Sequence, residues 1–358
     1  MNFSSRQAAV REKMAAAGLE GLLVSHLPNI RYLCGFSGSN GLLLLSSAGT
    51  TLFTDGRYRE QAAQEVEGAR LKVPARGDLW KAAAEAGARC SGMGLEAEHV
   101  TLAQRERWLR HWPGEARRLR FAGQWIEALR AVKEPDEVAA IRRAVVLASS
   151  VFMPTLKKLR TGMKETEAAG LLEFGLRRAG GEGLAFDTIV ASGTRSALVH
   201  GTPGAAPLPQ RGFVVMDYGV ILGGYVSDMT RTAHAGRPSR RAREVYDTVR
   251  AAQAAAIAVV RAGIPCAAVD RAARQVIQRA GWGQYFPHST GHGVGLEIHE
   301  APRLAATSSG SLLAGQVITI EPGIYIPGWG GVRIEDVAVV TEDGCEVLTP
   351  TSKEMQTF

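Results

Sequence analysis

Four carboxylates occupy matching places in two segments that read as β-hairpins. In residues 213–232, Asp217 and Asp228 lie on either side of the turn signal Gly223-Gly224, at the inner ends of two β-type runs. With one bulge residue, this hairpin would place the two aspartates opposite each other, with Cβ atoms about 5 Å apart. Two close carboxylates in an apolar setting repel each other unless a cation lies between them.

A second hairpin repeats the arrangement with glutamates. In residues 317–340 the turn is formed by residues 327–331, and Glu321 and Glu335 are symmetric about it. Arg333 precedes Glu335 by two residues and so shares its strand face. One acidic hairpin is as readily a solvated edge, but two of the same design indicate a divalent metal site. Oxygen ligands suit Mn²⁺, Mg²⁺ or Ca²⁺, and an added imidazole favours Mn, Co, Zn or Fe.

One histidine stands out as a source of that imidazole. His292 lies in PHSTGHGVGLEIHEAP between Gly291 and Gly293, which allow the backbone to approach a ligand closely. The same stretch contains His288 and His299, and a separate segment, LVHGTP, contains His200. The other four histidines have no comparable context and are interpreted as surface or core polar residues: His26, His99, His111 and His234.

Other catalytic chemistries lack their motifs. His299-Glu300 is not an H-E-x-x-H zinc helix, because Arg303 stands where the second histidine is required. The G-x-G-x-G around His292 lacks the strand–loop–helix setting of a nucleotide site, and there is neither a Walker loop nor a G-x-S-x-G. The four cysteines are far apart, with no C-x-x-C, and are expected to be reduced thiols in a cytoplasmic protein.

The elements that would position these residues fall into two groups. The chain of 358 residues is long enough for about two domains. Residues 1–130 alternate short strand and helix signals, with a hairpin expected at 41–54. The second part combines long helical patterns with strand-like runs, expected at 137–159, 164–179, 188–191, 212–216, 240–262, 267–280, 317–320 and 336–340. We therefore expect an α+β second domain at 131–358, and its two similar halves are compatible with a duplication.

Composition excludes several classes of protein. Hydrophobic residues make up 46% and charged residues 22% of the chain, as in ordinary globular proteins. The net charge of +7 comes from 42 Lys+Arg against 35 Asp+Glu. These cations form no long basic block, so we expect a solvated surface and no nucleic-acid partner. The N-terminus is too polar for a signal peptide, and apolar runs such as 254–260 are shorter than the ~20 residues of a membrane span.

Four motifs together resemble the pita-bread metallopeptidases, in the proline-specific branch of aminopeptidase P and prolidase. They are FDTIVASGTRSALVHGTP, MDYGVILGGYVSDMTRT, TGHGVGLEIHEAP and ITIEPGIYIPGWGGVRIEDVAVVT, in family order. Upstream, NIRYLCGFSGSNG and LFTDGRY are similar to the creatinase-type N-terminal domain of aminopeptidase P. The resemblance implies a creatinase-like α/β domain at 1–130 followed by a pita-bread catalytic domain at 131–358, and a homodimer.

The resemblance also implies a role for each candidate residue. Two divalent ions, Mn²⁺ or alternatively Co²⁺ or Zn²⁺, would be held by Asp217, Asp228, His292, Glu321 and Glu335, with Asp228 and Glu335 bridging. Glu321 would also shuttle the proton, His200 and His299 would hold the peptide carbonyl, and Arg333 would support the carboxylates. Three tyrosines are interpreted as cavity walls or as core: Tyr218, Tyr225 and Tyr325.

The expected activity is that of an Xaa-Pro aminopeptidase, acting on peptides with proline in second place. The first alternative is a prolidase-type dipeptidase, which differs only in requiring that the leaving group be proline alone. A remote alternative is a non-catalytic pita-bread binding module, but such relatives usually lack part of the ligand set that is complete here.

Overall fold

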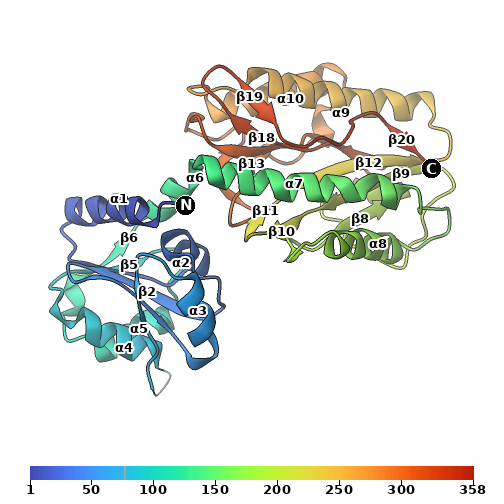
Figure 1. Ribbon diagram of the computed structural model, residues 1–358. Helices are drawn as coiled ribbons and strands as arrows, with labels where there is room; N and C mark the ends of the chain where they lie inside the picture. The colour runs from blue at the N-terminus through green and yellow to red at the C-terminus, as the bar shows by residue number, and fades with distance from the viewer. Residues whose placement is uncertain (76–77) are drawn as a thin grey trace. The chain divides into compact units, whose positions relative to one another are not determined.

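Residues 1–75 and 78–358 are described by a computed structural model, in which internal contacts divide the chain into Met1–Arg130 and Ala131–Phe358. The first unit is built on a six-stranded sheet in the order β4-β3-β2-β1-β5-β6 (Figure 1). Its strands are β1 Gly21–Val24, β2 Gly41–Ser46, β3 Gly49–Thr54, β4 Arg70–Lys72, β5 Met93–Glu96 and β6 Leu119–Ala122. Its α-helices are α1 Phe3–Ala16, α2 Leu27–Cys34, α3 Arg59–Glu65, α4 Leu79–Ala86, α5 Leu102–His111 and α6 Trp125–Ala131.

The predicted hairpin at 41–54 is present, because β2 and β3 pair antiparallel from Gly41↔Thr54 to Ser46↔Gly49. Strands β1 and β2 are buried along their whole length. Burial on both faces explains why the two strands read as continuous apolar runs, without the alternation of a half-exposed strand.

The second unit contains two similar halves. The first half consists of α7 Pro135–Leu156, α8 Glu165–Arg178, β8 Ile189–Ser192, β9 Gly212–Tyr218 and β12 Met229–Ala235. The second half consists of α9 Arg240–Val259, α10 Cys266–Arg279, β13 Gly291–Gly293, β15 Val317–Ile320 and β18 Asp336–Val340. In each half, a helix pair packs on antiparallel strands through its own hydrophobic core (Figure 1). The sheet orders β12-β9-β8 and β18-β15-β13 correspond element by element, as an internal duplication would produce.

Shorter strands complete the second unit. They are β7 Gly183–Leu184, β10 Val220–Leu222, β11 Tyr225–Val226, β14 Glu300–Leu304, β16 Gly323–Ile326, β17 Gly330–Arg333, β19 Cys345–Val347 and β20 Gln356–Thr357. The predicted α+β class is confirmed, and the predicted strands at 317–320 and 336–340 have the bounds of β15 and β18.

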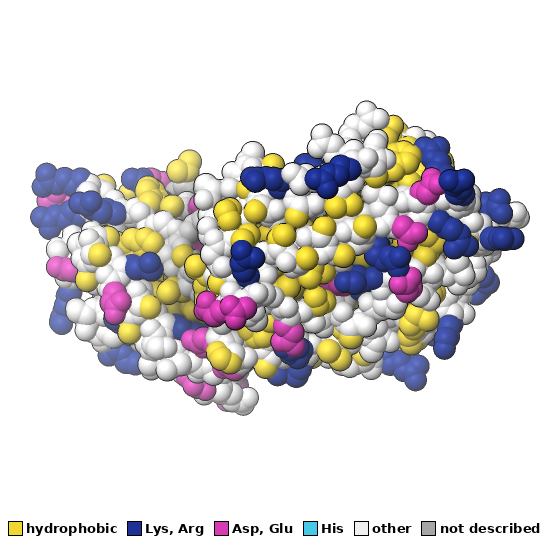
Figure 2. Space-filling model, turned by 90° about the horizontal axis from the view of Figure 1, so that it is seen from above, with side chains coloured by type: hydrophobic (Ala, Val, Ile, Leu, Met, Phe, Trp, Pro, Cys, Tyr) yellow, Lys and Arg dark blue, Asp and Glu magenta, His cyan; other side chains and the backbone are white. Residues whose placement is uncertain are grey.

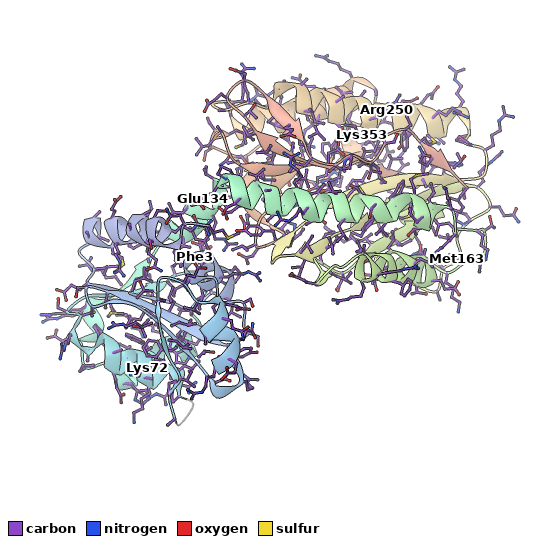
Figure 3. All side chains as sticks on the ribbon, viewed as in Figure 1. Phe3, Lys72, Glu134, Met163, Arg250 and Lys353 are labelled. Atoms are coloured by element: carbon purple, nitrogen blue, oxygen red, sulfur yellow. The ribbon has the colours of Figure 1, made fainter. Side chains whose placement is uncertain are left out.

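Among the described residues, α7 alone is long and apolar enough, by length and composition, to cross a membrane. It lies along the second unit from Glu134 toward Met163 (Figure 3). One face supplies residues such as Phe152 and Ile141 to two hydrophobic clusters of this unit. Its first turn carries Asp136 and the buried Glu137. Packing in the core therefore accounts for its apolar composition.

The hairpin that carries the two aspartates has a different register from the predicted one. Asp217 of β9 pairs with Thr230 of β12, not with Asp228, which lies just before β12. The reason is the turn: Leu222 pairs directly with Tyr225, and the two glycines between them have positive φ angles of 61° and 77°. Two left-handed residues form the tight type I′ turn, which leaves no bulge residue to shift the register. Asp217 and Asp228 are diagonal neighbours instead.

The hairpin that carries the two glutamates has the predicted symmetry. The pairs Ile320↔Asp336 and Gly323↔Arg333 belong to the same register, so Glu321 and Glu335 lie opposite each other between them. The loop between Ile326 and Gly330 has three residues, with Gly328 at a φ of 72°. Both hairpins therefore bring their acids to the place where one strand pair ends and the next begins.

Surface charge is dispersed on the face shown in Figure 2. Lys and Arg side chains occur there in separate groups, with Asp and Glu and apolar side chains between them.

Candidate metal centre

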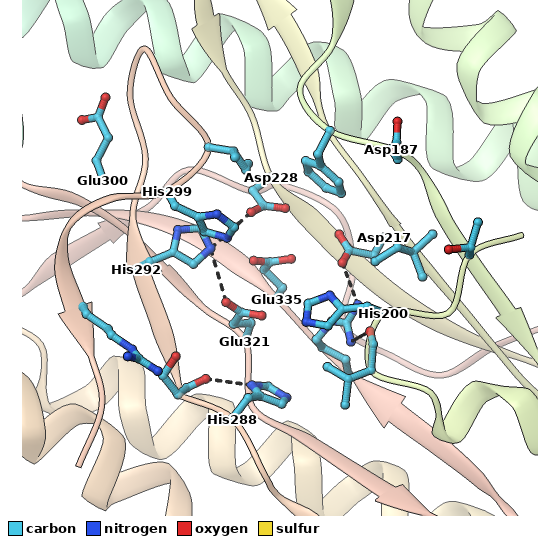
Figure 4. Close-up of a pocket in the computed structure, with 18 residues that line it drawn as sticks. Asp187, His200, Asp217, Asp228, His288, His292, His299, Glu300, Glu321 and Glu335 are labelled. Atoms are coloured by element: carbon cyan, nitrogen blue, oxygen red, sulfur yellow. Dashed lines mark hydrogen bonds and ion pairs between the residues drawn. The ribbon is translucent and has the colours of Figure 1, made fainter. Parts of the chain in front are cut away.

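All eight candidate residues line one cavity of about 730 Å³ in the second unit (Figure 4). They are Asp217, Asp228, His292, Glu321 and Glu335, with His200, His299 and Arg333. Each hairpin contributes two carboxylates from the strand ends described above, and the β13 strand contributes the imidazole. The two halves of the fold therefore meet at this cavity.

The imidazole of His292 lies among the carboxylates. Its Nε2 is 3.6 Å from Asp228 Oδ2 and 3.4 Å from Glu321 Oε1 (Figure 4). Asp228, His292 and Glu335 each offer a ligand atom within 4.8 Å of the others. This spacing fits a divalent cation shared among several donors.

A hydrogen bond fixes which nitrogen of His292 is available. Nδ1 is 3.0 Å from the Gly293 carbonyl oxygen, which only accepts, so Nδ1 carries the proton. Burial lowers the pKa of His292 to about 4, so the ring is neutral at pH 7. Its Nε2 lone pair therefore faces the carboxylates. A metal-binding histidine commonly donates its other N–H to a carbonyl in this way.

The carboxylates are placed where negative charge is costly. Burial, followed by the charge of Asp217, raises the pKa of Asp228 well above its ordinary value. Burial and then Asp228 do the same to Glu335, and burial raises the pKa of Glu321 to about 8. Such groups hold protons unless a cation replaces them, so the cluster fits divalent metal ions.

The two carboxylate oxygens of Asp217 differ in their hydrogen bonding, which independently supports a metal site. Its Oδ2 accepts a 2.6 Å hydrogen bond from Arg333 Nη2. Its Oδ1 is buried and has no hydrogen-bond partner among the described residues. A buried carboxylate oxygen normally has a partner. A metal ion held by Asp217 would supply it.

A threonine that sequence reasoning missed connects the two hairpins. Thr230 Oγ1 donates to Glu335 Oε2 at 2.8 Å and accepts from Arg333 Nε at 3.0 Å. Arg333 and Glu335 lie on one face of the opposite hairpin, as predicted, and Thr230 is the register partner of Asp217. The signal was present in the sequence as an alternation: Thr230 follows Asp228 by two residues and so shares its face.

A second link passes through Tyr325 and His288. Nδ1 of His288 donates to the Ser289 carbonyl at 2.8 Å, so its Nε2 accepts from the Tyr325 hydroxyl at 2.9 Å. The same hydroxyl accepts from Arg333 Nη1 at 2.7 Å. Tyr325 therefore supports Arg333 and is not a wall of the cavity. Neither Tyr218 nor Tyr225 is among the lining residues; both are buried in the core.

The two substrate-contacting candidates enter the cavity from different loops. His299 packs edge-on against His292, with ring centres 4.3 Å apart, and burial lowers its pKa. His200 lies beyond η4, the 3₁₀ helix Gly193–Ala197. Both rings therefore lie at the cavity with nitrogen atoms available to a bound carbonyl group.

The rest of the lining combines apolar walls with a few polar groups. Phe186, Ile189, Val199 and Ile298 supply apolar surface. Arg303 also lines the cavity, and its guanidinium has no hydrogen-bond or ion-pair partner within residues 1–75 and 78–358. In the sequence alone, Arg303 is informative only because it excludes a zinc helix. Its place in β14, as the register partner of His292, is visible only in the fold.

Comparison with known proteins gives matches to both units. Residues 139–342 match the model of metallopeptidase family M24, and residues 6–132 match the creatinase/prolidase N-terminal domain. An Xaa-Pro dipeptidase of Pyrococcus horikoshii is 34% identical over 345 residues, which cover 96% of either chain.

Two solved structures have the same fold over nearly their whole length. An Xaa-Pro dipeptidase from Bacillus anthracis has a TM-score of 0.96 and 36% identity, with 100% of both chains covered. An X-Pro aminopeptidase from Thermotoga maritima has a TM-score of 0.88 and 34% identity, with 95% of this chain and 98% of that chain covered.

Proposed function

Because this chain belongs to metallopeptidase family M24, with a creatinase/prolidase N-terminal domain, we propose that it is a dinuclear-metal Xaa-Pro dipeptidase. It would hydrolyse the bond between an N-terminal residue and a following proline. The observation that carries the proposal is the convergence of a complete O and N donor set on one cavity of about 730 Å³. A binding module without catalysis would not need this set.

We propose a dipeptidase in place of the aminopeptidase that was the first expectation from the sequence. Two of the compared proteins are named Xaa-Pro dipeptidases, against one X-Pro aminopeptidase. In the cavity, the Arg303 guanidinium, which has no partner among the described residues, would provide a cation for a free carboxylate. A dipeptide has that carboxylate on the proline itself, whereas in a longer peptide an amide stands at that place. Charge-assisted hydrogen bonds of this kind are among the stronger polar contacts.

The residues present would hold the metal ions and the substrate as follows. Asp217 would bind one ion, His292 and Glu321 the other, and Asp228 and Glu335 both. When bound, the ions would lower the pKa of a water molecule toward neutrality and so supply the nucleophile. Apolar walls such as Phe186 and Ile298 would pack against the proline ring.

Proton transfer is assigned to Glu321. Its carboxylate lines the cavity among the expected metal ligands, so it would take a proton from a water molecule held there and then donate it to the leaving proline nitrogen. His200 and His299 would donate hydrogen bonds to the carbonyl oxygen as negative charge develops on it. Arg333 and Thr230 touch no substrate in this scheme, but hold Asp217 and Glu335 in place.

Three finer points belong to the same proposal. We favour Mn²⁺, with Co²⁺ or Zn²⁺ as alternatives, because four carboxylates and one imidazole suit it. We also propose a homodimer, as the family resemblance implies; light scattering tests this. We also propose a cytoplasmic location, which the four free cysteines support. Finding the protein in a compartment where disulfides form would contradict the cytoplasmic location.

A pair of peptides tests the activity. We expect Mn²⁺-loaded protein to hydrolyse Ala-Pro at least tenfold more efficiently, in kcat/KM, than Ala-Pro-Ala. The Arg303→Met variant should lose efficiency toward Ala-Pro and keep its efficiency toward Ala-Pro-Ala. Glu321→Gln controls for contaminating peptidases and should hydrolyse neither. Equal or better turnover of Ala-Pro-Ala would support the aminopeptidase. If neither peptide is hydrolysed, the dipeptidase and the aminopeptidase are both refuted.

A further inference from the structure

We propose that the buried carboxylate of Glu165 is a positioning residue for His200, because it holds both ends of the loop that carries this histidine. The proposal rests on the proposed function, in which His200 contacts the substrate. The loop comprises residues 193–204, between β8 and β9. Glu165 is the first residue of α8 and does not line the cavity.

The first end of the loop is held by one carboxylate oxygen. Glu165 is 0% exposed. Its Oε1 accepts hydrogen bonds from the backbone N–H of Ser192 at 2.8 Å and from the Ser192 hydroxyl at 2.9 Å. Ser192 is the last residue of β8, so the carboxylate fixes the point at which the chain leaves the sheet.

The second end is held by the other oxygen. Glu165 Oε2 accepts from the backbone N–H of Gly204 at 3.2 Å and from Arg195 Nε at 3.1 Å. Arg195 in turn donates through Nη2 to the Thr202 carbonyl at 2.8 Å. The backbone N–H of Thr166 also donates to the Gly204 carbonyl at 3.2 Å. Two points twelve residues apart in the chain, Ser192 and Gly204, are therefore tied to one buried carboxylate.

Between these ends, the part of the loop near His200 has few anchors of its own. Leu198 is 50% exposed and His200 is also exposed. Ser196 Oγ accepts from the Gly331 N–H at 2.8 Å, and the Val199 carbonyl accepts from Arg333 Nη1 at 3.1 Å. These contacts hold the middle of the loop, and the Glu165 carboxylate holds its two ends. A displacement of about 1 Å in a catalytic group can reduce the rate about 100-fold.

A carboxylate is the group that this place requires. All the groups that face Glu165 are donors: two backbone N–H groups, one hydroxyl and one guanidinium. A glutamine would keep the size but present an NH₂ group to one set of these donors. We therefore expect Glu165→Gln to loosen both ends of the loop while the metal ligands, which lie on other elements, remain in place.

The test is a double-mutant cycle with His200→Ala in Mn²⁺-loaded, full-length protein. We expect Glu165→Gln to reduce kcat/KM for Ala-Pro about tenfold with unchanged metal content. In the His200→Ala background, the same substitution should reduce kcat/KM less than twofold, because residues that act through one another are not additive. A multiplicative loss, or no loss in the first background, would overturn the proposal.

A matched control separates positioning from general destabilisation. Glu137 is also buried, lies in the first turn of α7, and accepts from the Tyr225 hydroxyl at 2.8 Å. Glu137→Gln should lower stability without coupling to His200→Ala. If Glu165→Gln does not fold, Arg195→Met removes the guanidinium alone and should show the same coupling at about threefold. Additivity of that variant with His200→Ala would overturn the proposal too.

Hydrogen exchange gives a measurement that does not depend on turnover. Backbone amides of residues 193–204 should exchange faster in Glu165→Gln than in wild-type protein, and those of Glu137→Gln should not. If wild-type protein hydrolyses no Xaa-Pro peptide but exchange still increases, the proposed function fails and the loop anchor stands. Unchanged exchange in Glu165→Gln overturns the anchor whatever the activity.

Discussion

At the residue scale, the centre depends on buried hydrogen bonds as much as on its candidate ligands. Thr230 is the clearest case, because its hydroxyl connects Arg333 with Glu335 at 3.0 and 2.8 Å. Partners of this kind fix the orientation of a ligand, and their loss typically lowers metal affinity 10- to 100-fold.

Thr230→Val tests this link, since it keeps the shape and removes the hydroxyl. We expect Mn²⁺ affinity to fall at least tenfold and the free energy of unfolding to fall by about 1–3 kcal/mol, because Glu335 and Arg333 each lose a buried partner. Thr232→Val is the matched control. Thr232 is also buried, and among the described residues its hydroxyl hydrogen-bonds only with the backbone of Arg333. Equal loss of affinity in the two variants would contradict the role of Thr230.

The titration of the metal-free site gives a second prediction. Glu321 has a folded-state pKa of about 8 against an ordinary value of 4.5, so its proton stabilises the fold below pH 4.5. That contribution is lost as the pH rises toward 8. Burial lowers the pKa of His288 and His292 to about 4. Both histidines are therefore mostly neutral above pH 7 in the folded and in the unfolded state.

Between pH 7 and 8, the melting temperature of chelator-treated protein should therefore fall. Added Mn²⁺ should stabilise the protein increasingly over the same range, because it binds the deprotonated carboxylates. Differential scanning calorimetry of the two forms at several pH values measures both effects. A melting temperature of the metal-free form that stays level or rises would contradict the assigned pKa directions.

At the element scale, two hairpins set the spacing of the carboxylates. The symmetry of the glutamate hairpin could be predicted because its strand residues surround one clear turn. The register of the aspartate hairpin could not, since β-type residues alone do not show whether a bulge is present. The φ angles of Gly223 and Gly224, 61° and 77°, decide it. Likewise, no periodicity in the sequence indicates that Glu165 of α8 reaches both ends of a loop.

The turn can be tested with two glycine variants. Gly223→Ala places a side chain at a φ of 61°, which costs about 1–2 kcal/mol even though the space around it is open. Gly170→Ala is the control, because Gly170 lies in α8 in equally open space and should gain about 1 kcal/mol. Melting temperatures should therefore shift by about 2–4 °C per kcal/mol in opposite directions. A stabilising Gly223→Ala would refute the turn assignment.

At the scale of the whole molecule, one cavity is assembled from both halves of the second unit. Residues as far apart in sequence as His200 and Glu335 line it. The candidate residues could be chosen from the sequence because acids at strand ends and a glycine-flanked histidine are local signals. Arg303 could not be assigned to the cavity in this way, because its position depends on the pairing of β14 with β13. The proposal of a dipeptidase in preference to an aminopeptidase therefore rests on the fold and the comparisons as well as on the sequence.

The proposed function requires two metal ions, held by the five candidate ligands, for Xaa-Pro hydrolysis. A metal titration of chelator-treated protein, with bound metal and Ala-Pro turnover measured on the same samples, tests this requirement. Activity should be absent without metal and reach its maximum at two ions per chain. Asp228→Ala, which removes an expected bridge, should bind neither ion tightly. Full turnover by metal-free protein, or two tightly bound ions in Asp228→Ala, would contradict the proposed metal centre.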